Sequence, residues 1–243
     1  MSMNLQAYKN HLEQPWGKIY YDILFKQLED IKGQRILDFG SGFGIVANFL
    51  AEKNEVVAVE PDGAMIAERR QDFSYEQLQG SLDLLHKLPD QSFDAIVCHN
   101  VLEYVPDPKA CLQECSRLLR EGGQLSLVKH HEVGRILHTA VFEADADKAL
   151  RLLAGENYQT HSMGEAKLYQ LDDLIADLPL QTEHYQGLRI FYGLQDNSFK
   201  TQPGWAQQML VVEKAVYDRS PYRDIAAFQH FWLKKTAALV EGR

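Results

Sequence analysis

The 243-residue chain has few cysteines and no long apolar run. Its three cysteines, Cys98, Cys111 and Cys115, cannot form a paired disulfide framework, so reduced thiols in a cytoplasmic protein are expected. No run approaches the roughly 18 apolar residues that a membrane span needs, and the polar opening segment MSMNLQAYKNHLEQPW lacks the apolar core of a signal peptide. The sequence therefore predicts a soluble protein with no membrane partner.

An excess of basic residues is also absent. Lys and Arg total 25 against 34 Asp and Glu, a formal charge of -9, which argues against loose binding to nucleic acid. The negative charge is unevenly distributed along the chain, because residues 181–243 carry eight basic and six acidic side chains. This mildly basic segment still permits a narrower interaction with a structured RNA. Hydrophobic residues make up 45% of the chain, which excludes a disordered or fibrous protein.

Apolar strands and amphipathic helices alternate through the first half of the chain. Such alternation predicts an α/β fold with a doubly wound, mostly parallel sheet. Residues 56–59, within the expected strand of residues 55–60, are all apolar, which is typical of a strand covered on both faces. We expect Gly122 and Gly123 to close the last of these helices. The expected helices span residues 15–31, 45–53, 62–70 and 107–120, and the expected strands span 35–39, 55–60, 75–79, 93–99 and 124–129.

The second half of the chain has a different pattern. Residues 131–180 are acidic and helical, without a strong strand, and are interpreted as an insertion or lid over the sheet. Residues 182–192 can supply a late strand pair, and residues 203–235 predict two amphipathic helices separated at Ser220-Pro221. We therefore expect one domain, whose segments are an N-terminal helical part (1–32), a core (33–130), the insertion (131–180) and C-terminal strands and helices (181–243).

A glycine-rich loop follows the first expected strand. The sequence Asp38-Phe-Gly40-Ser41-Gly42-Phe-Gly44 places three glycines directly before a helix. Glycine lets a backbone turn sharply and approach a ligand closely, and a helix N-terminus presents free N–H groups. Twenty residues after Gly40, Glu60 ends the second strand, where a carboxylate can accept the hydroxyls of a ribose.

The glycine spacing differs from that of nicotinamide or flavin sites, where the third glycine comes three residues after the second. The loop instead resembles the first motif of class I S-adenosylmethionine-dependent methyltransferases. Further segments resemble that family at Ser81-Leu-Asp83-Leu84, at Asp94 to Tyr104, and at the turn before the fifth strand. The resemblance implies a seven-stranded Rossmann-like fold, methyltransferase activity and S-adenosyl-L-methionine as cofactor. The cofactor-binding residues that it implies are Tyr20, Asp38, Gly40, Ser41, Gly42, Gly44, Glu60, Pro61, Asp83, Leu84, His99 and Asn100.

Within this superfamily, the chain is similar to the bacterial tRNA 5-carboxymethoxyuridine methyltransferases, which esterify a wobble-uridine carboxylate. The similarity lies in His99-x-Val-Leu-Glu-Tyr-Val-x-Asp-Pro108, in Gly187-Leu-Arg189-Ile-Phe191 and in Ser-Pro-Tyr222. That family normally has an arginine for the cofactor's carboxylate where Tyr20 stands here, although Lys18 could substitute. The resemblance implies tRNA processing; the rival interpretations are a small-molecule methyltransferase, acting on a quinone precursor or carboxylic acid, and a cofactor-binding scaffold without turnover.

Methyl transfer to a carboxylate needs a cation that holds the acceptor, because the attacking oxygen is already anionic. Arg189 is the first candidate, followed by Arg135 and Lys129, although each can equally be a structural or solvated base. His130, His131 and His138 lack a repeated ligand spacing, so we expect no metal.

Overall fold

The computed structural model describes residues 5–160 and 164–237. The chain divides into two compact units. We call the first the helical unit; it contains Met1–Gln27, Lys129–Leu168 and Tyr185–His230. We call the second the sheet unit; it contains Leu28–Val128, Tyr169–His184 and Phe231–Arg243.

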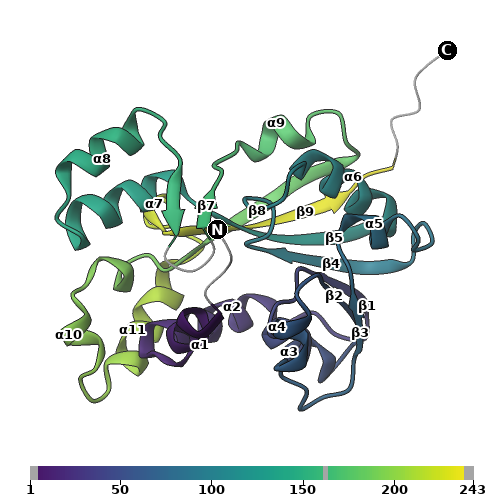
Figure 1. Ribbon diagram of the computed structural model, residues 1–243, viewed down its shortest axis with the longest axis horizontal. Coiled ribbons are helices and arrows are strands. Elements are labelled where there is room, and N and C mark those ends of the chain that lie inside the picture. Colours follow the sequence, from purple (N-terminus) through teal and green to yellow (C-terminus); the bar gives the residue numbers. More distant parts are fainter. Residues whose placement is uncertain (1–4, 161–163, 238–243) are drawn as a thin grey trace. The chain divides into compact units, whose positions relative to one another are not determined.

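A seven-stranded sheet has the strand order β3-β2-β1-β4-β5-β9-β8. Strands β1 to β5 pair in parallel, which requires helical crossovers and confirms the predicted doubly wound α/β fold (Figure 1). The strands are β1 (Arg35–Phe39), β2 (Glu55–Glu60), β3 (Glu76–Gln79), β4 (Phe93–His99), β5 (Leu119–His130), β8 (Leu180–Leu188) and β9 (Phe228–Lys235).

Both faces of the parallel strands are buried. Leu37, Val57 and Ile96 belong to a core that helix α6 (Pro108–Leu118) and helix α9 (Leu171–Ile175) cover. Alternate strand residues face the other way, where a backbone N–H of helix α3 (Ile45–Ala51) reaches Asp38. Helices α4 (Gly63–Ala67) and α5 (Leu82–Leu85) complete the crossovers.

Two helices begin directly after an aspartate whose side chain caps them. The side chain of Asp62 accepts the N–H of Ala64 at 2.8 Å, and that of Asp107 accepts the N–H of Ala110 at 2.9 Å. The predicted end of α6 is wrong, however, because Leu119 already has extended backbone and begins β5. Gly122, at φ 73°, lies within β5, where the register with β4 shifts. Strand pairing therefore overrides the helix-stop signal of the glycines.

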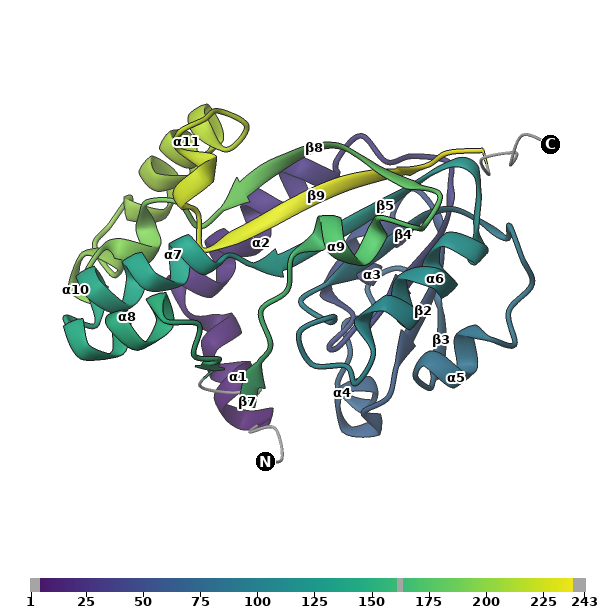
Figure 2. The same ribbon diagram turned by 90° about the horizontal axis from the view of Figure 1, so that it is seen from above.

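The C-terminal part contains two further corrections. Residues 182–192 do not form a strand pair, since one strand, β8, ends at Leu188. The predicted second helix of residues 203–235 is also wrong: helix α11 (Trp205–Val216) is followed by a 3-10 turn (Arg223–Ile225) and then by β9. Figure 2 shows β9 between β8 and β5. The aromatic residues of Phe228–Lys235 favour a strand with neighbours on both sides. This preference outweighs the helical spacing of the apolar residues.

Residues 131–180 are shared between the units, with Leu168 the last residue in the helical unit and Tyr169 the first in the sheet unit. They include the expected helices and, in addition, a short hairpin of β6 (Tyr158–Thr160) and β7 (Gly164–Ala166). In the part of the chain that the structure describes, no helix is long and apolar enough to cross a membrane. The remaining elements are α1 (Leu5–Glu13), α2 (Pro15–Leu28), α7 (Glu132–Leu137), a π-helical turn (His138–Phe142), α8 (Ala146–Leu153), a 3-10 turn (Tyr192–Leu194) and α10 (Asn197–Lys200).

Candidate functional site

Four neighbouring strand ends of the sheet unit carry most of the residues predicted to bind the cofactor. Strands β3, β2, β1 and β4 are adjacent and parallel, so their carboxyl ends meet at one edge. The glycine loop follows β1, and Glu60 and Pro61 stand at the end of β2. Asp83 and Leu84 follow β3, whereas His99 and Asn100 end β4. Ligands of doubly wound folds bind at this edge.

The conformation of the glycine loop leaves little place for side chains. Gly40, Gly42 and Gly44 all have positive φ, at 77°, 55° and 65°. A Cβ on Gly40 would lie 2.4 Å from a methyl of Val101, and one on Gly44 would lie 2.2 Å from the Tyr75 hydroxyl. Glycine is therefore required at both positions, for conformation and for space.

Glu60 ties the glycine loop to the end of β2. Its carboxylate accepts the N–H of Gly42 at 2.8 Å and that of Asp62 at 2.9 Å. Burial raises the pKa of Glu60, while these two N–H groups act in the lowering direction. A carboxylate has about four acceptor positions, so both oxygens can accept a further hydrogen bond. Glu60 can thus hold the loop and still accept hydroxyl groups of a ligand.

Asp38 is a buried acid directly before the loop. Its side chain is 3% exposed, and Oδ2 has no hydrogen-bond partner among the described residues. Burial raises the pKa of Asp38 to about 7, with a further contribution from the charge of Glu60 and an opposing one from the N–H of Ala47. An unsatisfied buried carboxyl oxygen is costly and indicates a site built for an added donor.

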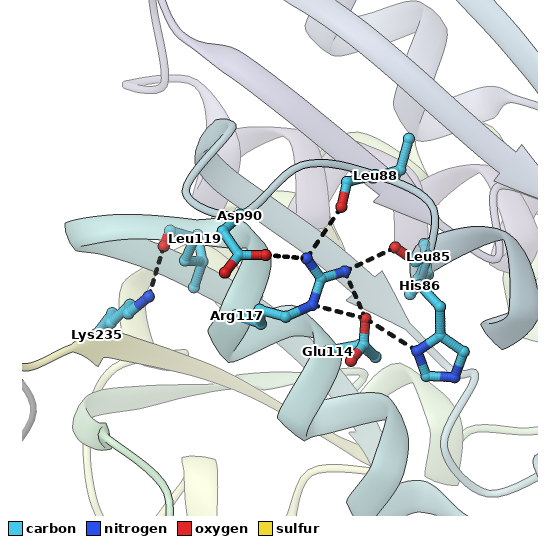
Figure 3. A network of polar contacts seen from close by, with 8 residues as sticks. All are labelled: Leu85, His86, Leu88, Asp90, Glu114, Arg117, Leu119 and Lys235. Carbon is cyan, nitrogen blue, oxygen red and sulfur yellow. Dashed lines mark hydrogen bonds and ion pairs between the residues drawn. The ribbon is translucent and has the colours of Figure 1, made fainter.

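The segment that carries Asp83 and Leu84 is held by a polar network (Figure 3). Arg117 donates to the carbonyl oxygens of Leu85 and Leu88, at 2.8 and 2.9 Å, and pairs with Asp90. It also contacts Glu114, which faces His86. Because Leu85 ends α5, this arginine anchors that helix to α6. Asp83 itself is exposed and Leu84 is half-buried.

At the end of β4, His99 contacts the Ser126 hydroxyl at 2.8 Å through Nε2. Burial lowers the pKa of His99 to about 3, so the ring is neutral at physiological pH. Asn100 has a positive φ of 56°, and its N–H donates to the Val128 carbonyl at 2.8 Å. This bend turns the chain out of the sheet at the predicted site edge. Ser41, in the glycine loop, contacts the Gln77 amide at 3.5 Å.

The other predicted residues lie in the helical unit. Tyr20 packs edge-on against Tyr21 and Phe228, with ring centroids 5.1 and 5.4 Å apart. Lys129 is 6% exposed near the end of β5. The Nε of Arg135 donates to His130 at 3.1 Å, and its guanidinium lies 5.3 Å from the ring centroid of Phe228. Arg135 is thus engaged by its own unit.

Arg189 differs from Arg135. It directly follows β8 with φ 61°, and its buried Nε has no hydrogen-bond partner in residues 5–160 and 164–237. Its positive charge acts on two buried neighbours. The pKa of Lys200 falls to about 8 and that of His138 to about 4, in each case through burial first and then the charge of Arg189. Arg189 therefore lies near a second buried cation, Lys200, and near His138, whose low pKa keeps its ring neutral at physiological pH.

Comparison with known proteins identifies the core of the chain. Residues 37–127 match the family model described as "Methyltransferase domain". This segment of the chain is therefore similar to a methyltransferase domain. This match agrees with the predicted methyltransferase class, for which S-adenosylmethionine is the expected cofactor.

Curated relatives of the methyltransferase domain are named "Ubiquinone biosynthesis O-methyltransferase". The protein of that name from Xanthomonas oryzae is 35% identical over 104 residues, which cover 40% of this chain and 44% of the relative. The one from Klebsiella pneumoniae strain 342 is 25% identical over 178 residues, 71% of each chain. The chain thus spans less than half the length of the first of these relatives.

Solved structures show the same fold around the methyltransferase domain. An S-adenosylmethionine-dependent methyltransferase from Mesorhizobium loti aligns with a TM-score of 0.58 at 20% identity, covering 89% of this chain and 97% of that one. One from Thermotoga maritima aligns with a TM-score of 0.62 at 18% identity, covering 96% of both chains. At these identities the similarity establishes the fold.

Sequence reasoning missed the structural roles of two buried acids, Glu60 and Glu213. Glu60 was predicted as a ribose ligand, but its hydrogen bonds to Gly42 and Asp62 were not expected. Glu213, which is 0% exposed, lies in a helix that forms part of the family resemblance, but the sequence assigned it no role. Its signal was its position: it lies eight residues after the buried Trp205, on the same face of helix α11. An acid on the apolar face of a helix indicates a specific buried partner.

Proposed function

We propose that this protein transfers a methyl group from S-adenosylmethionine to an acceptor that carries a carboxylate. The observation that carries the first part is the glycine loop held by Glu60 at the edge where four parallel strands end. The second part rests on Arg189, whose guanidinium retains an unused donor within a cluster of basic residues.

The residues of the sheet unit fit S-adenosylmethionine. The loop glycines adopt positive φ angles, and because they lack side chains their backbone is accessible to a ligand. Glu60 would accept the ribose hydroxyls, and Asp83 and Leu84 would border the adenine. The unsatisfied oxygen of Asp38 suits a donor from the amino-acid portion.

When bound, S-adenosylmethionine would supply a methyl group activated by a positively charged sulfur: the acceptor's anionic oxygen would bond to the methyl carbon while the carbon–sulfur bond breaks, and the sulfur would leave in neutral S-adenosylhomocysteine. A carboxylate is ionised at neutral pH, so the protein does not need to remove a proton. Its own contribution is to orient the acceptor and to exclude water. The neutral state of His99 agrees with a pocket-lining role for this residue.

Cofactor binding is tested by calorimetric titration with S-adenosylhomocysteine. We expect Glu60→Ala to weaken binding at least about tenfold, because one ligand of the ribose and the tether of Gly42 are both lost. Glu55→Ala is the matched control: Glu55 begins the same strand, is exposed and pairs with Arg35. Unchanged affinity in Glu60→Ala, or absence of binding by the unaltered protein, would contradict the proposal.

For the acceptor we propose 5-carboxymethoxyuridine at the wobble position of tRNA, on the residues from Gly187 to Phe191 and the basic residues around Arg189. Mass spectrometry of tRNA nucleosides from a deletion strain should show loss of the methyl ester and accumulation of the free acid. Complementation with the unaltered gene should restore the ester, whereas Arg189→Ala should not. An unchanged ester level in the deletion strain would exclude this acceptor.

A second candidate is methylation of a phenolic quinone precursor, which the names of the curated relatives favour. Such an acceptor has a hydroxyl in place of the carboxylate, so Arg189 would have no anion to hold. Purified protein can be offered a catechol and a free 5-carboxymethoxyuridine anticodon stem-loop with the same labelled cofactor. Methylation of the catechol alone, unaffected by Arg189→Ala, would favour this second function.

A further inference from the structure

The segment after β8 holds Arg189 in a strained backbone conformation. Its φ of 61° lies in the left-handed region, which is strained for a residue with a Cβ. Such strain persists only where surrounding contacts impose it. The contacts of residues 187–193 therefore explain how Arg189 is held in this conformation.

Glu213 supplies the strongest of these contacts. Its carboxylate accepts three consecutive backbone N–H groups, from Ile190 at 2.9 Å, Phe191 at 2.7 Å and Tyr192 at 3.1 Å. The side chain is 0% exposed. Burial raises the pKa of Glu213, and the three N–H groups and the charge of Arg189 oppose that rise. A buried carboxylate with three donors fixes the path of the chain directly after Arg189.

Other contacts fix the residues before Arg189 and the space around its side chain. The amide of Gln27 donates to the Gly187 carbonyl at 3.1 Å, and Ala227 N–H donates to the Arg189 carbonyl at 3.0 Å. A Cβ on Gly193 would lie 2.8 Å from Nε of Arg189. The guanidinium, with its carbon 5.8 Å from the Tyr192 ring centroid, occupies the space that this glycine leaves.

We propose that Glu213 is a positioning residue for acceptor binding, which acts by holding residues 190–192 so that Arg189 presents its guanidinium to the acceptor's anionic group. This inference rests on the proposed function of Arg189. A purely structural role, in which Glu213 only anchors α11, predicts a loss of stability without a specific effect on the acceptor.

The first test compares Glu213→Gln with Asp218→Asn, a change of an exposed acid just beyond the same helix. Glutamine keeps the shape of the side chain but turns one acceptor into a donor that opposes a backbone N–H. We expect the KM for the acceptor stem-loop to rise about ten- to hundredfold in Glu213→Gln. Affinity for S-adenosylhomocysteine should not change, and Asp218→Asn should behave like the unaltered protein. An unchanged KM would overturn the proposal.

A second variant, Gly193→Ala, displaces the arginine without touching Glu213. Gly193 has no positive φ, and the atoms that an added Cβ meets belong to the flexible Arg189 side chain. The fold should therefore survive, with a melting temperature close to that of the unaltered protein. We expect the same rise in acceptor KM as in Glu213→Gln. A normal KM in this stable variant would contradict the claim that the placement of Arg189 matters.

A double-mutant cycle separates positioning from stability. If Glu213 acts through Arg189, Glu213→Gln should raise the acceptor KM less than about twofold in an Arg189→Ala background. An equal rise in both backgrounds would show that Glu213 works independently of the arginine.

An acceptor-independent measurement distinguishes failure of this inference from failure of the proposed function. The Nε–H resonance of Arg189 can be identified in nitrogen-15 NMR spectra by its absence from Arg189→Lys. We expect a dispersed signal in the unaltered protein and a shifted or averaged one in Glu213→Gln and Gly193→Ala. Unchanged spectra would reject the positioning role even if the protein methylates the stem-loop. Altered spectra without methylation would instead count against the acceptor.

Discussion

In each of the two units, a buried glutamate accepts backbone N–H groups of a loop, but the two loops differ in the residues that adopt positive φ. In the sheet unit, buried Glu60 accepts N–H groups of Gly42 and Asp62; in the helical unit, buried Glu213 accepts those of Ile190, Phe191 and Tyr192. The first carboxylate holds a loop whose glycines adopt positive φ without strain. The second holds a loop that forces an arginine into that region. Glycine thus reaches positive φ without strain in the first loop, whereas Arg189 reaches it with strain in the second.

The largest effect should come from filling the glycine loop of the sheet unit. Gly40→Ala places a Cβ 2.4 Å from the Val101 methyl at a φ of 77°, so the loop must move. We expect affinity for S-adenosylhomocysteine to fall at least about a hundredfold, because displacement of a binding loop forfeits several hydrogen bonds. Isothermal titration calorimetry measures the loss.

The matched control is Gly33→Ala, since Gly33 has a φ of 68° but nothing within 4 Å of an added Cβ. It should lose stability through backbone strain alone and keep its affinity for S-adenosylhomocysteine. Replacing Val101 by alanine in the Gly40→Ala protein should recover part of the affinity, because the clashing methyl is removed. Equal affinities in Gly40→Ala and the unaltered protein would show that the loop does not approach the cofactor.

Removing the anchor of helix α5 should have the next largest effect. Arg117→Ala leaves the carbonyl oxygens of Leu85 and Leu88 without this donor, at a cost of about 2 kcal/mol in the free energy of unfolding. Urea denaturation measures the change. Arg120→Ala, which removes a half-exposed pairing with Asp94, should cost no more than about 1 kcal/mol. Similar losses in the two variants would show that the buried end of the network contributes nothing extra.

Lys200, a buried base of the helical unit, makes the stability of the protein depend on pH. Because burial and Arg189 lower the pKa of Lys200 to about 8, its proton is lost earlier in the folded than in the unfolded protein. Stability should therefore rise between about pH 8 and the unfolded pKa of 10.5, with a slope of up to about 1.4 kcal/mol per pH unit.

The measurement is the difference in unfolding free energy between the unaltered protein and Lys200→Met across this range. As the pH rises, the unfolding free energy of the unaltered protein should increase relative to that of Lys200→Met. Lys234→Met, at a half-exposed lysine on β9, serves as the control and should show no such trend. Parallel stability curves for Lys200→Met and the unaltered protein would mean that Lys200 titrates normally.

The smallest effect concerns a hydroxyl of the helical unit. Tyr192 is 0% exposed, and its OH lacks a hydrogen-bond partner among the described residues. Tyr192→Phe should leave the free energy of unfolding unchanged or raise it by up to about 1 kcal/mol, because an unsatisfied polar group is removed. A clear loss of stability on thermal unfolding would reveal a buried partner.

The sequence by itself determined the alternating fold and the strand ends at which we propose that the cofactor binds. Strand periodicity, Asp62 at the start of α4 and the glycines before α3 are local signals, and the structure has strands, a side-chain cap and positive φ angles at these places. Glycine at positive φ and apolar runs in buried strands follow from backbone sterics and solvation, which depend on neighbours in the chain.

Only the tertiary structure decided the rest. Phe228–Lys235 became a strand because β5 and β8 pair with it, and Leu119 left its helix for the same reason. Likewise, the link between Glu213 and residues 190–192 joins segments more than twenty residues apart, with no local pattern to announce it. Hydrogen bonds between distant segments depend on packing of the whole unit, so the placement of Arg189 could be read only from the folded chain.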